Sequence, residues 1–185
     1  MKIAVCGCAG IGKSTLVEAL ARRLDIKALD EHYEALFSPP GTFASEPEKL
    51  IPLFFQVLDE KYEQQQRAGS FVVDRAGIDL FNLWMAKGLA RHPEQTQRFS
   101  KLCRQQLGSY DFLVFPPWGV LPLLPHDKAD GRVRVQDPWV QLRNHVAILG
   151  MARLWAEPEK ILCLSESTTE LTAWVDQVVN SSEWH

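Results

Sequence analysis

Five short apolar runs alternate along the chain with longer stretches in which apolar residues recur at helical spacing. The apolar runs predict buried strands at residues 3–6, 26–29, 71–73, 112–115 and 161–164. The stretches between and after them predict helices at residues 13–24, 45–67, 78–90, 93–107, 137–155 and 170–179. This alternation is typical of α/β proteins, so we expect a single domain, residues 1–185, with about five parallel strands and helices on both faces. Ligands of such sheets bind at the carboxyl ends of the strands.

Local signals at the ends of helices support three of these boundaries. Asp137 precedes a proline, which predicts a side-chain cap followed by proline in the first helical turn. Ser45 precedes Glu48 by three residues, which is the spacing of a capping box. Because a residue before proline avoids helical geometry, the pair His92 and Pro93 predicts the end of one helix and the start of another.

The strongest motif is the run Gly7-Cys8-Ala9-Gly10-Ile11-Gly12-Lys13-Ser14, which fits the phosphate-binding pattern G-x-x-x-x-G-K-[ST] completely. Its glycines let the backbone turn tightly with N–H groups pointing inward, and the helix that follows adds its positive end. Lys13 is expected to reach the β- and γ-phosphates of ATP or GTP, and Ser14 to offer its hydroxyl to Mg²⁺. We therefore expect a nucleotide site formed by Gly7, Ala9, Gly10, Ile11, Gly12, Lys13, Ser14 and Thr15.

Acidic residues follow two of the predicted strands. Asp74 ends the run at 71–73, where P-loop proteins hold Mg²⁺, and Arg75 beside it offers a bidentate donor to phosphate oxygens. Asp30 and Glu31 end the run at 26–29, where a carboxylate can accept a proton from an attacking hydroxyl. Neighbouring residues point to different faces, so we expect one of the two to act and favour Asp30. The structural alternative for Asp74 and Arg75 is a salt bridge at the end of the strand. For Asp30 and Glu31 the alternatives are a helix cap and a solvated loop.

A polar loop with two arginines, Asp130-Gly131-Arg132-Val133-Arg134, precedes the predicted helix at 137–155. Such a loop can close over phosphates, expel water and neutralise the charge being transferred. We therefore expect a lid over residues 116–136, with Arg132 and Arg134 as catalytic candidates between which the sequence does not choose. A solvated basic loop is the alternative interpretation.

Charge and composition narrow the classes of partner. The formal net charge is −3, which disfavours nucleic acid, and no apolar run approaches the ~20 residues needed to span a membrane. The first apolar run is also too short for a signal peptide. The four cysteines lack zinc spacing and are predicted to be small buried hydrophobic residues: Cys6, Cys8, Cys103 and Cys163. We expect a cytoplasmic protein with a small-molecule partner and with neither a nucleic acid nor a membrane partner.

Aromatic residues suggest further contacts. Four of them are candidates for stacking on a planar substrate, although the helical spacing around Trp84 fits a core better: Tyr33, Phe37, Trp84 and Trp118. Four tryptophans fit a core or a subunit interface equally well, so the choice between a monomer and a homodimer stays open: Trp139, Trp155, Trp174 and Trp184.

Together these motifs resemble those of the P-loop kinases of nucleosides and nucleotides. In particular they resemble the small AAA-like ATPase/kinase group that includes NadR-type ribosylnicotinamide kinase domains. Gly7–Ser14 matches the phosphate loop, and Asp74-Arg75 is similar to the Asp-Arg pair of deoxynucleoside and thymidylate kinases. Asp130-Gly131-Arg132 is similar to the Asp-Gly-x-Arg lid, although here Arg132 follows glycine directly and a second arginine comes at Arg134.

The resemblance implies a three-layer P-loop fold that transfers the γ-phosphoryl group of Mg·ATP to a small hydroxyl-bearing acceptor. It implies Asp30 as the base, Asp74 as the residue that organises Mg²⁺, Arg75 as a substrate contact, and Arg132 or Arg134 as the lid arginine. Two rival functions remain on the sequence alone: an ATPase or GTPase that acts as a switch, and a module that binds nucleotide without turnover. No guanine-reading Asn-Lys-x-Asp supports the GTPase.

Overall fold

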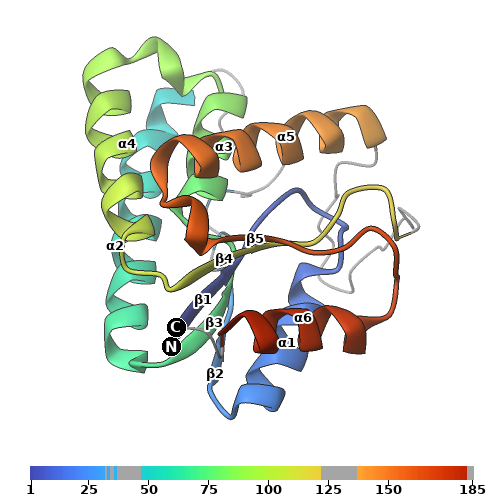
Figure 1. Cartoon of the computed structure of the whole chain (residues 1–185). Helices are drawn as coiled ribbons and strands as arrows, with labels where there is room; N and C mark the ends of the chain where they lie inside the picture. The colour runs from blue at the N-terminus through green and yellow to red at the C-terminus, as the bar shows by residue number, and fades with distance from the viewer. Residues whose placement is uncertain (32, 34–35, 37–46, 122–136, 183–185) are drawn as a thin grey trace.

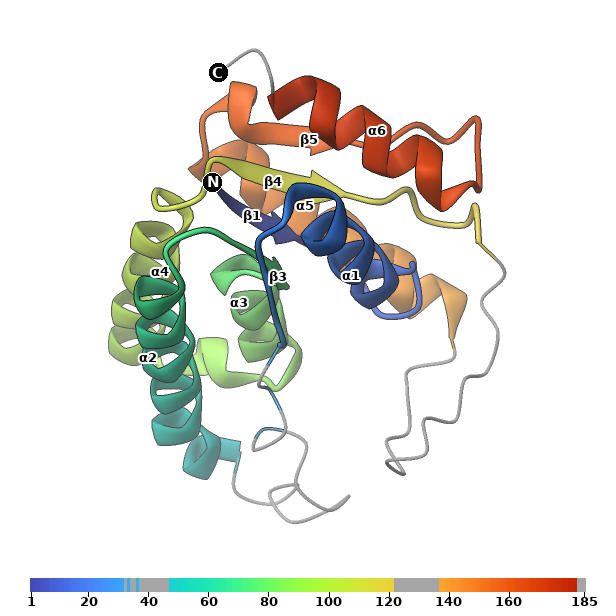
Figure 2. The same ribbon diagram turned by 90° about the horizontal axis from the view of Figure 1, so that it is seen from below.

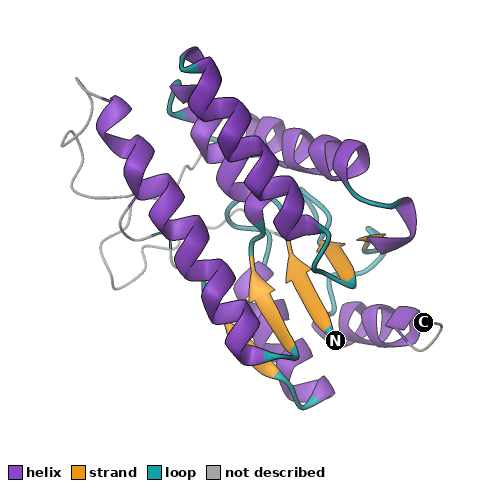
Figure 3. Cartoon of the chain, turned by 90° about the vertical axis from the view of Figure 1, so that its left-hand side faces the viewer, coloured by secondary structure: helices purple, strands orange, loops and turns teal. Residues whose placement is uncertain are grey.

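The computed structural model describes residues 1–31, 33, 36, 47–121 and 137–182. These residues form a sheet of five parallel strands in the order β2-β3-β1-β4-β5. The strands are β1 (Lys2–Val5), β2 (Lys27–Leu29), β3 (Phe71–Asp74), β4 (Phe112–Phe115) and β5 (Ile161–Cys163). Figure 3 shows the strand arrows pointing the same way between the helices. The predicted α/β class with five parallel strands is therefore confirmed.

Six α-helices lie in the described part of the chain. They are α1 (Lys13–Leu24), α2 (Ile51–Ala68), α3 (Gly77–Ala86), α4 (Pro93–Leu107), α5 (Pro138–Trp155) and α6 (Leu171–Ser182). Short 3₁₀ turns are η2 (Pro47–Leu50), η3 (Leu89–Arg91) and η4 (Pro158–Lys160). None of the described helices is both long and apolar enough to cross a bilayer.

The sheet separates two hydrophobic cores, and successive residues of the central strands alternate between them. Ile3 and Val5 face the core that α1 and α6 cover. Ala4 and Val73 face the larger core, which α2, α3, α4 and α5 cover. Figures 1 and 2 show these two helical layers on opposite faces of the strands, which is the predicted three-layer arrangement.

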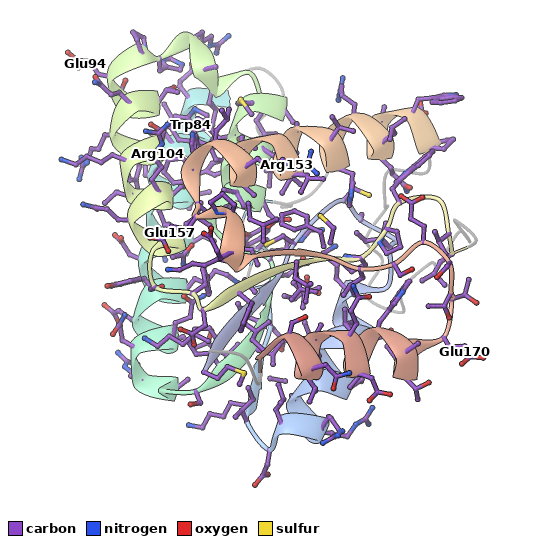
Figure 4. All side chains as sticks on the ribbon, in the orientation of Figure 1. Trp84, Glu94, Arg104, Arg153, Glu157 and Glu170 are labelled. Atoms are coloured by element: carbon purple, nitrogen blue, oxygen red, sulfur yellow. The ribbon has the colours of Figure 1, made fainter. Side chains whose placement is uncertain are left out.

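Aromatic packing fills the larger core. Trp84 is fully buried and stacks on Phe99 with ring centroids 4.7 Å apart. In Figure 4, Trp84 lies among the helices, whereas Glu94 and Glu170 extend from the outer edges of the molecule. Trp84 is therefore a core residue, as its helical spacing favours, and is not available to stack on a substrate.

The four tryptophans that fit either a core or an interface differ in their surroundings. Trp174 is buried, and Trp155 packs on Phe81 with centroids 5.3 Å apart. Trp139 is 72% exposed, and Trp184 lies outside the described residues.

Two predictions, one about a helix and one about a cysteine, are corrected by the structure. The helix predicted at residues 78–90 is divided, because α3 ends at Ala86 and Gly88 adopts a left-handed backbone conformation before η3. Cys163 is exposed on the edge strand β5, so the prediction that all four cysteines are buried is wrong for this residue. The other three cysteines are buried.

Two cap predictions differ in outcome. The Asp137 side chain accepts hydrogen bonds from the backbone N–H groups of Trp139 and Val140, which confirms the predicted cap of α5. The predicted cap at Ser45 lies outside the described residues.

Candidate active site

The phosphate loop connects β1 to α1 at the carboxyl end of the sheet. Gly7, Gly10 and Gly12 all have positive φ angles, of 123°, 84° and 82°. A Cβ atom on Gly7 would lie 2.8 Å from Cδ1 of Ile11 and 2.9 Å from Nδ1 of His145. Only glycine fits this position without displacing both neighbours, so the first glycine of the motif is fixed by packing as well as by backbone conformation.

Lys13 lies folded onto this loop. Its ammonium donates a hydrogen bond to the carbonyl of Cys8 at 2.7 Å, and the residue is 5% exposed. Burial and the nearby positive charge of Arg75 lower the pKa of Lys13, while Asp74 and Asp79 oppose that shift. The loop therefore already holds its lysine against the backbone that would surround a phosphate.

Ser14 and Asp74 together offer oxygen atoms of the kind that a divalent cation binds. The Ser14 hydroxyl donates to Oδ2 of Asp74 at 2.6 Å, which joins the start of α1 to the end of β3. The other oxygen, Oδ1, is buried and has no hydrogen-bond partner in the described part of the chain. Burial would raise the pKa of Asp74, but the charges of Lys13 and Arg75 lower it. A hydroxyl beside an ionised carboxylate with an unused oxygen matches the oxygen ligands that Mg²⁺ prefers.

Arg75 follows Asp74 in a left-handed conformation, with φ at 67°. Its Nε donates to Oε2 of Glu31 at 2.6 Å, and one terminal nitrogen donates to the Gly7 carbonyl at 3.4 Å. Burial would lower the pKa of Arg75, but Glu31 and Asp79 raise it above its ordinary value. Arg75 thus links the end of β2 to the phosphate loop.

The two acidic residues after β2 lie in different surroundings. Glu31 turns its carboxylate to Arg75, whereas Asp30 is exposed. The favoured residue, Asp30, is therefore accessible at the carboxyl edge of the sheet, and Glu31 is engaged in an ion pair.

Asp79 is a site residue that the sequence analysis missed. Its carboxylate accepts the backbone N–H of Gly7 at 2.9 Å and that of Ala76 at 3.0 Å, and it lies 3.7 Å from Arg75. The side chain has no exposed surface, and this burial raises its pKa. An acidic residue in the first turn of the predicted helix at 78–90 was the available signal, since such a residue can bond back to the N-terminal N–H groups.

Lys61 of α2 was also missed, because it lies in the middle of an amphipathic helix. It is fully buried, and its ammonium donates to the Asp74 carbonyl at 3.0 Å. It also reaches the carbonyls of Asp30 and Glu31, at 3.3 and 3.4 Å. Burial lowers the pKa of Lys61 to about 8. Nothing in the sequence distinguishes it from the exposed lysines of other helices.

Tyr33 fills the space between these cations. Its ring lies 5.5 Å from Nζ of Lys61 and 5.9 Å from Cζ of Arg75, and its hydroxyl donates to the Ala76 carbonyl at 3.1 Å. Tyr33 is 1% exposed, so it supports the site from within and has no free face for a substrate.

His145 of α5 also lies against the phosphate loop at Gly7. The residue is 7% exposed, and its Nδ1 has no hydrogen-bond partner among the described residues. Burial and the charge of Lys13 lower the pKa of His145, which favours the neutral ring beside Gly7. The sequence analysis gave this histidine no role.

The remaining candidates lie partly outside the described residues. Arg132, Arg134 and Phe37 belong to that part of the chain, as do residues 122–136 of the predicted lid. Its first residues, 116–121, are described, and Leu121 approaches the phosphate loop at Gly12. Trp118 lies in this segment, half-buried, with an indole N–H that has no partner in the described chain.

Comparisons with known proteins agree with this fold. Residues 2–154 match the model of a family described as an AAA domain. The structure of NadR protein in complex with NR aligns with 98% of this chain at a TM-score of 0.70 and 18% identity, and this chain spans 51% of the NadR chain. No curated protein matches the sequence.

Two further solved structures are similar over nearly their whole length. Deoxyadenosine kinase from M. mycoides aligns over 100% of both chains, with a TM-score of 0.69 and 14% identity. Thymidylate kinase from Candida albicans aligns with 99% of this chain over 91% of its own, with a TM-score of 0.63 and 18% identity. The fold is therefore that of P-loop kinases.

Proposed function

We propose that this chain, which belongs to the AAA-domain family, is an ATP-dependent phosphotransferase that transfers a γ-phosphoryl group to a small hydroxyl-bearing acceptor. The acceptor class that we propose is a nucleoside or a nucleotide-like metabolite, with GTP as an alternative donor. One observation carries the proposal: the Ser14 hydroxyl and the Asp74 carboxylate meet at 2.6 Å, directly beside the phosphate loop and with one carboxylate oxygen unused.

The phosphate loop supplies the donor site in this proposal. The backbone from Gly7 to Thr15 would surround the phosphates, with contacts from Ala9, Gly10, Ile11 and Gly12, and the ammonium of Lys13 would exchange the Cys8 carbonyl for phosphate oxygens. Ser14 and Asp74 would hold Mg²⁺, which supplies charge neutralisation across the phosphates when bound.

In this proposal the general base lies at the end of β2. The acceptor oxygen forms a bond to the γ-phosphorus, the bond between that phosphorus and the β,γ-bridging oxygen breaks, and ADP leaves. The proton of the acceptor hydroxyl passes to Asp30, whose exposure makes it the accessible carboxylate of the pair. Glu31 instead orients Arg75, whose guanidinium is the proposed contact to phosphoryl oxygens.

The proposal also includes the lid and the organisation of the chain. Arg132 and Arg134 would neutralise the transferred charge from a lid over residues 116–136. We also propose that the chain acts as a single cytoplasmic domain.

A coupled ADP assay tests the function directly. The protein is incubated with Mg·ATP and a panel of nucleosides, nucleotides and vitamins, and at least one acceptor should raise ADP formation above the acceptor-free rate. With that acceptor, Asp30→Asn should lower turnover by roughly 10²-fold or more, because general-base catalysis typically contributes that much. ADP affinity should not change.

The matched control is Asp59→Asn, which removes an exposed carboxylate on α2 and should leave turnover intact. ADP release that no acceptor stimulates and that Asp30→Asn does not affect would favour a hydrolase. Nucleotide binding without any ADP release would favour a binding module. Either result contradicts the kinase proposal.

A further inference from the structure

Lys61 presents the least expected feature of the site. A lysine ammonium is among the most costly groups to bury, and a buried charge needs several good partners to persist. Lys61 is fully buried within α2, yet its ammonium forms no ion pair with a carboxylate of residues 1–31, 47–121 or 137–182. Its partners are the three main-chain carbonyls of Asp30, Glu31 and Asp74.

These three carbonyls belong to two different strand ends. Asp30 and Glu31 follow β2, and Asp74 ends β3, so a single cation bridges the two segments that carry the proposed acid and the proposed metal ligand. The face of Tyr33 lies 5.5 Å from the ammonium and completes its surroundings. An ammonium offers three donors, and Lys61 has three carbonyl partners among the described residues, so each donor can be matched to one carbonyl of this bridge.

We propose that Lys61 is a positioning residue that holds the carboxyl ends of β2 and β3 in fixed relation, so that the Ser14–Asp74 pair stays aligned for Mg²⁺. This inference rests on the proposed phosphoryl transfer for its purpose, but it concerns only the geometry of the chain itself. Lys61 is fully buried and donates to the carbonyl of Asp74, so it acts through the backbone of that residue.

Asp74 connects Lys61 to Ser14 within a single residue. Its carbonyl accepts from Lys61, and its carboxylate accepts from Ser14 within the same residue. Loss of the ammonium frees the strand end to rotate, and the carboxylate moves with it. Residues behind a metal ligand typically change metal affinity by 10–100-fold when removed, because ligand orientation is lost.

Binding of ADP with and without Mg²⁺ isolates this effect from catalysis and needs no acceptor. The ratio of the two ADP affinities, measured by isothermal titration calorimetry, reports how well the protein aligns its metal ligands. Lys61→Met removes the charge and the donors while keeping much of the side-chain volume. We expect this variant to lower the Mg²⁺ ratio by roughly tenfold, with metal-free ADP affinity unchanged.

Conservative and control variants sharpen the result. Lys61→Arg keeps a cation with several donors and should restore most of the ratio. Arg67→Gln, on the same helix, removes a 79%-exposed charge and should leave the ratio at the wild-type value. If Lys61 contributes only to stability, Lys61→Met will have a lower unfolding temperature than the wild type and the same Mg²⁺ ratio. That outcome overturns the proposal.

Three further outcomes are decisive. If Lys61→Met does not fold, Lys61→Leu removes every donor with a different side-chain shape, and a wild-type ratio in that variant also overturns the proposal. A wild-type protein whose ADP affinity ignores Mg²⁺ overturns both the metal site and the role of Lys61. An acceptor panel without a hit, combined with a lowered ratio in Lys61→Met, leaves the positioning role supported and contradicts only the kinase.

Discussion

A single buried carboxylate anchors the base of the phosphate loop. Asp79 accepts one N–H from Gly7 and another from Ala76, so its truncation leaves two buried backbone donors without partners. Each such donor costs about 1–3 kcal/mol, and the relief of burying a charge offsets part of that cost. We expect Asp79→Ala to lower the free energy of unfolding by about 2–3 kcal/mol, measured by urea denaturation.

Asp111 provides a matched control for that measurement. It also accepts a backbone N–H from β1, that of Lys2 at 2.7 Å, but its side chain is 55% exposed. Water can replace the lost partner there, so Asp111→Ala should cost less than about 1 kcal/mol. Equal losses in the two variants would show that burial of the Gly7 donor contributes nothing.

His145 should make the stability of the protein depend on pH. Its pKa in the folded protein lies below the ordinary 6.5, because the ring is buried and lies near the charge of Lys13. As the pH falls below about 6.5, the unfolded chain therefore takes up this proton first, and the free energy of unfolding decreases. Above that pH both states are neutral at His145 and the contribution is constant.

Replacement by glutamine removes this titration. Urea denaturation between pH 5 and 8 should show a smaller loss of stability at the acid end for His145→Gln than for the wild type. His92→Gln, which changes a histidine at the start of α4, is the control. An acid limb that persists unchanged in His145→Gln would assign it to other groups.

Single residues also mark the limit of what the sequence could predict about the site. Ser14, Lys13 and Asp74 were identified because a local motif and a strand end fix their positions before any tertiary contact is known. Lys61 donates to a residue 13 positions away and Asp79 accepts from one 72 positions away, and no local pattern predicts either contact. The local signal at Asp79 indicates only its bond to Ala76 in the first turn. Charged residues in amphipathic helices are ordinarily solvated, which hides the exceptions.

At the scale of elements, the start of α5 depends on one side chain. The Asp137 carboxylate accepts from Trp139 at 2.8 Å and from Val140 at 3.4 Å, and Pro138 follows the cap. Asp137→Ala should lower the free energy of unfolding by about 1 kcal/mol and reduce the melting temperature by a few degrees in calorimetry. Asp137→Asn keeps a capping oxygen and should restore most of the loss. An alanine variant as stable as the wild type would mean that the cap is not needed.

The elements themselves were largely predictable because local rules govern them. α1 and α4 begin and end where the sequence analysis placed them, since a glycine loop and a proline mark their starts. The predicted helix at 78–90 failed at Gly88, because periodicity alone does not show that a glycine will adopt a left-handed conformation. Strand order could not be read from the chain either, since pairing of β1 between β3 and β4 is a long-range property.

At the scale of the whole molecule, the two cores share their strands. Val72 belongs to the core under α1 and α6, and its neighbour Val73 belongs to the core under α2 to α5. If the helices left one face of the sheet, the strand residues on that face would become exposed. Their neighbours in the same strands pack in the other core, so the two cores are coupled through the strands. The cores should therefore unfold together, as a single domain does.

Fluorine NMR can follow each core separately in one sample. Trp84 lies in the larger core and Trp174 in the smaller one, and both are buried. In protein labelled with 5-fluorotryptophan, Trp84→Phe and Trp174→Phe assign the two resonances by their disappearance. We expect both native signals to decrease at the same urea concentration in the wild type, because strands common to both cores couple them. Separate midpoints would instead mean that the α1–α6 layer unfolds independently, and that the chain consists of two cooperative units.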